Sequence, residues 1–143
     1  MAKALIVYST RSGQTKRIAE LIAEGARFTG LEAEVKSSTE IKKPEDLQGY
    51  DAYAFGSATY HGEMMESMKQ LLFLAERAGL EGKCGGAFGS FGWSGEAPDR
   101  IQNTMKHVLK MNTTGDCLRL KSAALEGGIP MAQGFGKDLA SKV

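Results

Sequence analysis

Apolar runs alternate with amphipathic segments along most of the chain. Residues 4 to 9, ALIVYS, form a run that is too short for a helix and rich in branched side chains, which predicts a strand buried on both faces. Over residues 14 to 28 the apolar side chains recur at helical spacing, at Ile18, Leu21, Ile22 and Phe28. Gly30 follows as a stop signal, so this stretch predicts a helix directly after the first strand.

The same alternation continues to the end of the chain. Further strands are predicted at 32 to 37, 50 to 57, 83 to 90 and 117 to 122. Pro44 predicts a short helix start between the second and third strands. The later helices are predicted from an apolar stripe of Met64, Met65, Met68, Leu71, Leu72 and Ala75 ended by Gly79, from Ile101, Met105, Val108 and Leu109 within 97 to 110, and from Phe135 and Leu139 within 129 to 143. Strands alternating with crossover helices predict an α/β fold, a three-layer doubly wound arrangement around a five-stranded parallel sheet in the order 2-1-3-4-5.

Composition adds limits on domain number and partners. A chain of 143 residues with 42% hydrophobic content predicts a single domain over residues 1 to 143. Eighteen Lys and Arg against 17 Asp and Glu give a net charge of +1, which excludes the basic excess typical of a nucleic-acid binder. Apolar runs are too short for a membrane span, so a soluble, cytoplasmic protein is expected. Cys84 and Cys117 form no metal-binding motif and are expected to be small buried residues.

Three strand ends carry unusual residues. They are the turn 9 to 15 and the loops 56 to 64 and 89 to 99. In a doubly wound sheet, ligands bind outside the carboxyl ends of the strands, where the winding reverses. All three segments follow strands that are neighbours in the predicted order, so we expect them to line one crevice.

The first of these segments, STRSGQT, is suited to a phosphate. It places the hydroxyls of Ser9, Thr10, Ser12 and Thr15 with Gly13 at the start of a helix, where backbone N–H groups and the helix dipole favour an anion. It matches neither the Walker pattern nor the three-glycine dinucleotide fingerprint, which argues against ATP and NAD. For any single hydroxyl, a helix cap is the alternative, but four hydroxyls exceed what a cap needs.

The other two loops each present an aromatic side chain, Tyr60 and Trp93, among Gly, Ser and Thr residues. Either aromatic alone is more often a cover over the core, but together they indicate a flat ligand between or beside them. A flat heterocycle with a phosphate, bound without a metal, indicates flavin mononucleotide (FMN).

These residues resemble the short-chain flavodoxin family over essentially the whole chain. The phosphate-loop pattern of that family, Ser/Thr-x-Ser/Thr-Gly-x-Thr, is matched by Thr10 to Thr15. Residues 88 to 97, FGSFGWSGEA, are particularly similar to the flavodoxin-like domain of flavodiiron proteins, whose metal-binding domain has no counterpart here. The resemblance implies the flavodoxin-like fold and an FMN cofactor.

The resemblance also implies which residues hold FMN. The phosphate would be held by the turn, the ribityl chain and one ring face by the middle loop, and the pyrimidine edge by the third loop, with Trp93 on or near the ring. The expected cofactor-binding residues are Ser9, Thr10, Arg11, Ser12, Gly13, Gln14, Thr15, Ser57, Ala58, Thr59, Tyr60, His61, Gly62, Ser90, Phe91, Gly92, Trp93, Ser94 and Gly95.

The function implied is electron transfer between soluble redox proteins, without substrate chemistry, nucleic acid or membrane. The alternative is an FMN-dependent NAD(P)H:quinone reductase of the same superfamily, whose middle-loop spacing Gly-Ser-x-Thr-x-x-Gly-x-Met is also similar. A phosphoaccepting signalling domain of the same winding is disfavoured, because the first strand ends in Ser9 and Thr10 and not in an acidic cluster.

Two features depart from the usual flavodoxin pattern. His61 stands between the aromatic of the middle loop and Gly62, where many flavodoxins have the glycine directly. The chain is also nearly neutral, whereas typical flavodoxins are strongly acidic. Four acidic residues fall on or just after the two flavin loops: Glu63, Glu66, Glu96 and Asp99. They fit two interpretations equally well, an acidic rim around the flavin or ordinary acids in the first turns of helices.

Overall fold

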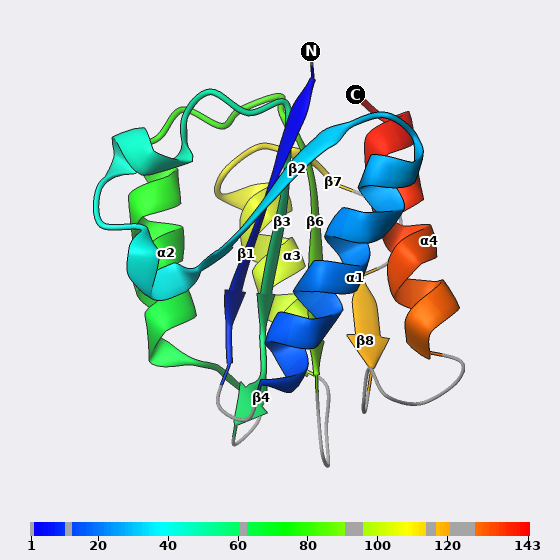
Figure 1. Ribbon diagram of the computed structural model, residues 1–143. Helices are drawn as coiled ribbons and strands as arrows, with labels where there is room; N and C mark the ends of the chain where they lie inside the picture. The colour runs from blue at the N-terminus through cyan, green and yellow to red at the C-terminus, as the bar shows by residue number, and fades with distance from the viewer. Residues whose placement is uncertain (1, 11–12, 61–62, 91–95, 114–116, 121–127) are drawn as a thin grey trace.

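The computed structural model describes residues 2–10, 13–60, 63–90, 96–113, 117–120 and 128–143 (Figure 1). Its main sheet is built from β1 (Lys3–Ser9), β2 (Glu32–Ser37), β3 (Ala52–Ser57), β6 (Cys84–Ser90), β7 (Asn112–Thr113) and β8 (Leu118–Leu120). The order is β2-β1-β3-β6-β7, with β8 also paired to β6, and every pairing is parallel. The predicted order 2-1-3-4-5 is therefore confirmed.

The fifth position of the sheet is divided between two short strands. Cys84 pairs with Ala52 on one side and with Asn112 on the other, and Phe88 pairs with Gly56 and with Leu118. Both β7 and β8 thus lie along the same edge of β6. The predicted strand 117 to 122 corresponds to β8, while β7 was not predicted, and residues 121 and 122 lie outside the described residues.

Among the described residues, four α-helices cover the sheet: α1 (Gln14–Phe28), α2 (Glu66–Glu76), α3 (Glu96–His107) and α4 (Gly128–Ser141). Two short 3₁₀ helices, η1 (Ser38–Glu40) and η2 (Pro44–Leu47), follow β2. Figure 1 shows α1 and α4 on one side of the sheet and α2 and α3 on the other, and each pair closes a separate half of the hydrophobic core. The three-layer prediction is confirmed.

Helices α1 and α4 meet at two glycines. A methyl group at Gly25 would collide with the backbone carbonyl of Gln133, and one at Gly136 would collide with the carbonyl of Ile22. Each glycine therefore allows the backbone of the other helix to approach closely. The inward-facing residues predicted for the last helix, Phe135 and Leu139, are both buried.

On the face of the sheet covered by α2 and α3, the sequence prediction was wrong about where α2 begins and where α3 ends. Met64 and Met65 precede α2: Met64 lies in β5 (Glu63–Met64), which pairs antiparallel with β4 (Thr59–Tyr60). Val108 lies past the end of α3 and is 52% exposed. Periodicity alone cannot separate a helical stripe from an apolar residue in a flanking hairpin or turn.

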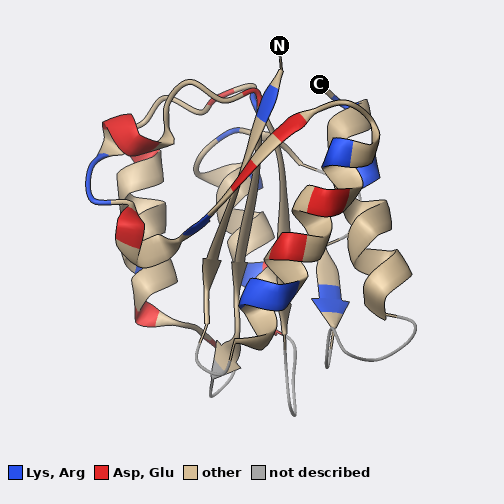
Figure 2. Cartoon of the chain, in the orientation of Figure 1, with Lys and Arg blue, Asp and Glu red and all other residues tan. Residues whose placement is uncertain are grey.

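Charges of both signs are interspersed over the fold, as Figure 2 shows. Within the described ranges, none of the helices combines the length and apolar character that crossing a bilayer requires.

Candidate functional site

Three neighbouring strands end in a buried serine. Ser9 closes β1, Ser57 closes β3 and Ser90 closes β6, and all three side chains are buried. Ser9 and Ser57 are direct partners in the β1–β3 register. The carboxyl ends of these strands therefore lie side by side, at the lower end of the view in Figure 1, as the strand order predicts.

The hydroxyl of Ser9 is used inside the protein. It lies 2.6 Å from the hydroxyl of Ser38 in η1 and accepts a hydrogen bond of 2.9 Å from the hydroxyl of Ser67 in α2. A hydroxyl has one donor hydrogen and two acceptor lone pairs, so these two contacts occupy most of its capacity. Ser9 thus joins the end of β1 to η1 and α2, beneath the turn that follows it.

The start of α1 is joined to the end of β6 in the same way. Thr15 is fully buried, and its hydroxyl lies 2.7 Å from that of Ser90. Because Ser90 is the second residue of the third predicted loop, 89 to 99, this contact fixes the first turn of α1 against the start of that loop.

The turn between β1 and α1 leaves the helix start open. The hydroxyl of Thr10 accepts a hydrogen bond of 3.0 Å from the N–H of Gly13, which has a left-handed φ of 88°. Within the described residues no side chain caps the N-terminus of α1, and Gly13 and Gln14 are exposed. The first N–H groups of a helix have no partner within it and carry its positive dipole end, so this is a place suited to an anion.

The charges on the first turn of α1 agree with an anion site. That turn carries Lys16 and Arg17 and no acidic residue. Neither basic residue was singled out from the sequence, although their position two and three residues after the predicted helix start was the available signal. Both side chains are exposed, so they raise the local potential without a fixed geometry.

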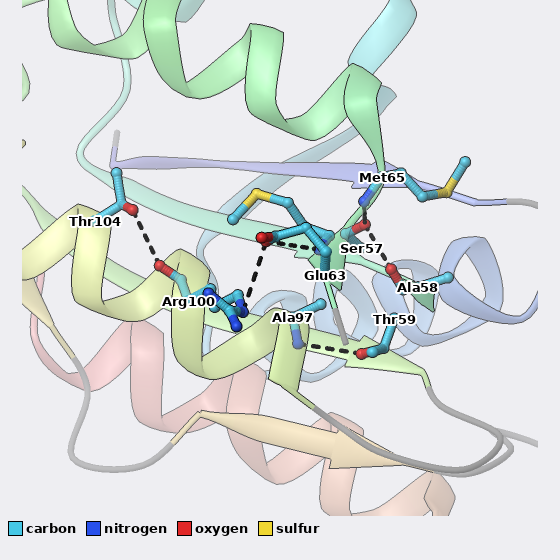
Figure 3. Close-up of polar contacts among 9 residues, drawn as sticks. Ser57, Ala58, Thr59, Glu63, Met65, Ala97, Arg100 and Thr104 are labelled. Carbon is cyan, nitrogen blue, oxygen red and sulfur yellow. Dashed lines mark hydrogen bonds and ion pairs between the residues drawn. The ribbon is translucent and has the colours of Figure 1, made fainter. Parts of the chain in front are cut away.

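The middle loop is a hairpin, β4 to β5, with Thr59 opposite Met64 and Tyr60 opposite Glu63. Its base is held by Ser57, whose hydroxyl accepts a 2.9 Å hydrogen bond from the N–H of Met65 and donates one of 2.9 Å to the carbonyl of Ala58 (Figure 3). The N–H of Ala58 in turn donates to the carbonyl of Ser9 at 3.2 Å. The hairpin is thereby anchored to the ends of β1 and β3.

The hairpin is also joined to α3. The hydroxyl of Thr59 accepts a 3.1 Å hydrogen bond from the N–H of Ala97, the second residue of α3, and so satisfies one of the free amides at that helix start (Figure 3). On the next strand, Glu63 Oε1 lies 3.7 Å from Arg100 Nε and accepts a 3.1 Å hydrogen bond from the N–H of Met64. These contacts connect the β4–β5 hairpin to α3, the helix that follows the third predicted loop.

Two of the four acids considered for an acidic rim are paired with cations. Glu63 contacts Arg100, and Asp99 forms an ion pair with Arg119. Glu66 and Glu96 lie in the first turns of α2 and α3, where acids favour the helix dipole. The rim is therefore partly neutralised and partly the ordinary first-turn arrangement.

Glu96 adds an unused acceptor at this end of the sheet. Its Oε2 atom is buried and has no hydrogen-bond partner among the described residues. A buried carboxylate oxygen without a partner is costly, so such an atom is suited to receive an N–H or O–H group of a ligand.

Cys117 contacts the first turn of α3 through Asp99. Its Sγ lies 3.2 Å from Asp99 Oδ1, and both cysteines are free. Burial, followed by the hydrogen bond to Asp99, raises the pKa of the Cys117 thiol to about 11. Burial also raises the pKa of the Cys84 thiol, so both remain neutral thiols near neutral pH. Cys84 is buried as predicted, but Cys117 is only partly buried.

About half of the sequence-predicted site can be placed. The structure brings Ser9, Thr10, Gly13, Gln14, Thr15, Ser57, Ala58, Thr59 and Ser90 to one end of the sheet, together with the backbone of Tyr60. The remaining predicted residues lie outside the described residues: Arg11, Ser12, His61, Gly62, Phe91, Gly92, Trp93, Ser94 and Gly95.

The residues present fit a phosphate-bearing cofactor. The turn from Thr10 to Thr15 offers hydroxyl and backbone N–H donors at an open helix start with basic neighbours, which is the donor set that a phosphate dianion takes without a metal. The sequence did not indicate the internal contacts of Ser38, Ser67, Ala97 and Arg100, because their partners lie far away in the chain.

Comparison with known proteins identifies the flavodoxin family. The family model described as Flavodoxin matches residues 6–132. The chain is 42% identical over 100 residues to a flavodoxin of Aquifex aeolicus, an alignment that covers 66% of this chain and 54% of that protein. It is 32% identical over 122 residues to an NAD(P)H dehydrogenase (quinone) of Archaeoglobus fulgidus, covering 68% of this chain and 64% of that protein. The chain thus spans less than two thirds of the length of these relatives.

Solved structures share the fold over nearly the whole chain. A flavodoxin from the domain Archaea superimposes with a TM-score of 0.91 at 33% identity, covering 98% of this chain and 97% of that one. The flavodiiron protein of Giardia intestinalis superimposes with a TM-score of 0.89 at 28% identity, covering 98% of this chain but 36% of that one. Members of the family identified by these matches bind FMN. The chain belongs to the flavodoxin family.

Proposed function

We propose that this chain binds FMN at the carboxyl ends of β1, β3 and β6 and carries electrons between soluble redox proteins in the cytoplasm. The observation that supports this most directly is the start of α1, which no described side chain caps and which lies beside the anchored β4–β5 hairpin. An anion site and an aromatic-bearing hairpin at one end of a doubly wound sheet suit a ligand with a phosphate at one end and a flat ring at the other.

The phosphate would be held by the turn from Thr10 to Thr15. The exposed backbone N–H groups at Gln14 and beyond and the hydroxyl of Thr10 supply donors, while Lys16 and Arg17 add positive charge nearby. Thr15 contributes its N–H, because its hydroxyl is engaged with Ser90. Arg11 and Ser12 belong to this proposal on the strength of the sequence motif alone.

The ribityl chain and the ring would lie between the hairpin and the segment after Ser90. Ser57, Ala58 and Thr59 form the base of the hairpin, and their own hydrogen bonds hold it in place. Tyr60, His61, Gly62 and residues Phe91 to Gly95 complete the proposed ring site.

Bound FMN supplies one- and two-electron redox chemistry, and the chain positions and tunes it. The turn and the start of α1 bind the phosphate, and the hairpin, held by Thr59 and Arg100, orients the ring side of the site. Glu96, whose Oε2 atom is buried without a hydrogen-bond partner among the described residues, would offer that oxygen to an N–H or O–H group of the cofactor. Negative charge at such a position disfavours added electron density on the flavin and lowers its potential.

Titration of the flavin-free protein with FMN tests the proposal. We expect a one-to-one yellow complex with quenched flavin fluorescence, and then reduction only when a separate reductase is supplied. Absence of fluorescence quenching would reject FMN binding, while a stable complex that passes no electrons to any protein acceptor would reject the carrier role alone.

An NAD(P)H:quinone reductase is the second candidate. It is favoured by the similarity to the NAD(P)H dehydrogenase (quinone) of Archaeoglobus fulgidus. Rapid bleaching of the FMN complex by NAD(P)H alone, followed by reoxidation with a quinone, would establish the enzyme and overturn the carrier.

A further inference from the structure

An apolar groove lies between α2 and the C-terminal end of α3, outside the proposed flavin site. Its apolar lining is formed by Met64, Leu72, Phe73 and Val108, and its volume is about 290 Å³. Phe73 is 71% exposed and Val108 52% exposed, whereas large aromatic side chains are normally well buried. Exposed aromatic surface beside a groove is typical of a protein–protein contact.

Phe73 stands as a ridge at the side of this groove. It also borders a second hollow of about 570 Å³ on the other side of α2, which is lined by η1 residues such as Ser38 and Thr39. A ridge next to a groove is a self-complementary shape, because a two-fold axis beside Phe73 places each ridge in the groove of the other copy.

Two charged residues of α2 fix the direction in which a second copy fits. Lys69 and Glu76 border the groove at positions four residues before and three residues after Phe73, which separates them by about 10 Å along the helix. Two α2 helices packed antiparallel therefore place Lys69 of each copy opposite Glu76 of the other. Parallel packing would instead place like charges opposite one another.

We propose that this surface, formed by Met64, Lys69, Leu72, Phe73, Glu76 and Val108, is a two-fold interface with a second copy of this chain. Phe73 is its buried centre, and the two Lys69–Glu76 pairs form its polar rim, an arrangement found in many interfaces. The surface comprises only a few residues, against about 20 to 30 per partner in a stable complex, so the dimer is weak and forms in roughly the micromolar range.

Sedimentation velocity of the full chain between about 5 and 500 μM tests the interface. We expect a concentration-dependent shift from monomer to dimer, and Phe73→Asp should raise the dissociation constant at least about tenfold. Phe28→Asp is the matched control, because Phe28 is another exposed aromatic (59%) on a helix of the opposite face, and it should leave the dimer unchanged.

Charge reversal tests the antiparallel geometry. K69E and E76K each place like charges opposite one another twice, and each should raise the dissociation constant about tenfold. The double variant K69E/E76K restores both opposite-charge contacts and should dimerise like the original. An equal mixture of the K69E and E76K chains should form a heterodimer for the same reason.

A chain that stays monomeric over the whole range overturns the proposal, as does a dimer that Phe73→Asp leaves intact. Failure of the double variant to recover rejects the antiparallel pairing. If the chain is monomeric but Phe73→Asp slows electron delivery to a protein acceptor, the surface belongs to a different protein and not to a second copy. Unchanged thermal unfolding and FMN affinity in each variant show that the fold is retained.

Discussion

The hydroxyl oxygens of Thr15 and Ser90 lie 2.7 Å apart and join the first turn of α1 to the end of β6. Both side chains are buried. A pair of buried hydroxyls satisfies each other only while both are present. The contact therefore couples the stability of the turn from Thr10 to Thr15 to that of the central sheet.

Thr15→Val keeps the shape of the side chain but leaves the Ser90 hydroxyl without this partner. We expect the free energy of unfolding of the FMN-free protein to fall by about 1 to 3 kcal/mol, measured in urea. Combining it with Ser90→Ala should cost less than the sum of the two single changes, because the double variant leaves neither group unpaired. Thr104→Val is the control: the Thr104 hydroxyl donates to the Arg100 carbonyl in an exposed position, so its loss should cost about 0.5 kcal/mol or less. Equal losses for both valine variants would contradict the coupling.

Gly13→Ala should weaken FMN binding through backbone conformation. Gly13 has a φ of 88° and open space around it, so a methyl group meets no neighbour but the left-handed conformation costs about 1 to 2 kcal/mol. We expect the dissociation constant of FMN, followed by fluorescence quenching, to rise about tenfold.

The matched glycine is Gly134, which also has open space around it but lies within α4 with an ordinary helical conformation. Gly134→Ala should leave FMN affinity unchanged and raise stability by up to about 1 kcal/mol. Improved binding in Gly13→Ala would exclude the conformational argument.

Thr59→Val should loosen the hairpin from α3. The Thr59 hydroxyl accepts the N–H of Ala97, and its removal leaves a helix-start amide free. We expect a three- to tenfold faster dissociation of FMN in stopped-flow measurements, with a loss of stability of about 1 kcal/mol. Thr29→Val removes a hydroxyl that donates to the Ala26 carbonyl at the far end of α1. It should lower stability without changing the dissociation rate, and a change of rate there would mean that the effect is not local.

The Cys117 thiol should be unreactive at moderately alkaline pH. Its pKa of about 11 lies above that of a free thiol, so at pH 8 its alkylation by iodoacetamide should be about a hundredfold slower than in the unfolded chain. Asp99→Asn removes the charged acceptor next to the sulfur and should speed the reaction, as measured by peptide mass spectrometry. An unchanged rate would show that Asp99 has no part in the shift.

The same thiol makes stability depend on pH in the alkaline range. A raised pKa means that the unfolded chain loses this proton first, so the contribution of the thiol to stability is complete below about pH 8.5 and is lost as the pH rises towards 11. Cys117→Ser should reduce this alkaline slope in urea unfolding, whereas a slope equal to that of the original chain would contradict the assignment.

Two elements that local pattern determines were predicted to the residue, while the bounds of most others were predicted to within one to three residues. Helix α1 begins at Gln14 and ends at Phe28, and β2 spans Glu32–Ser37, both as expected, because the apolar period and the flanking glycine act locally. The start of α2 was misplaced because Met64 and Met65 are apolar in the hairpin as well as in a helical stripe. Strand β7 was missed because a two-residue strand exists only through its pairing with Cys84 and Gly85.

The sequence predicted which end of the sheet the described candidate residues occupy, but not the hydrogen-bond partner of each hydroxyl. Ser9, Thr15 and Ser57 all come to the expected end of the sheet, yet each hydroxyl bonds within the protein, to partners from η1, α2, β6 or the hairpin base. Such partners are distant in sequence, so no local pattern reveals them. The open helix start, by contrast, follows from the turn sequence itself.

The close approach of α1 and α4 at Gly25 and Gly136 has a consequence for synthesis of the chain on the ribosome. The half of the core under α2 and α3 is made by residues 5 to 111, but the half under α1 needs α4, which ends at Ser141. Until α4 emerges, α1 exposes an apolar strip to the cell, and folding of that half waits for contacts between segments more than a hundred residues apart. A nascent chain that stops before α4 therefore lacks the residues that cover α1 in the folded protein.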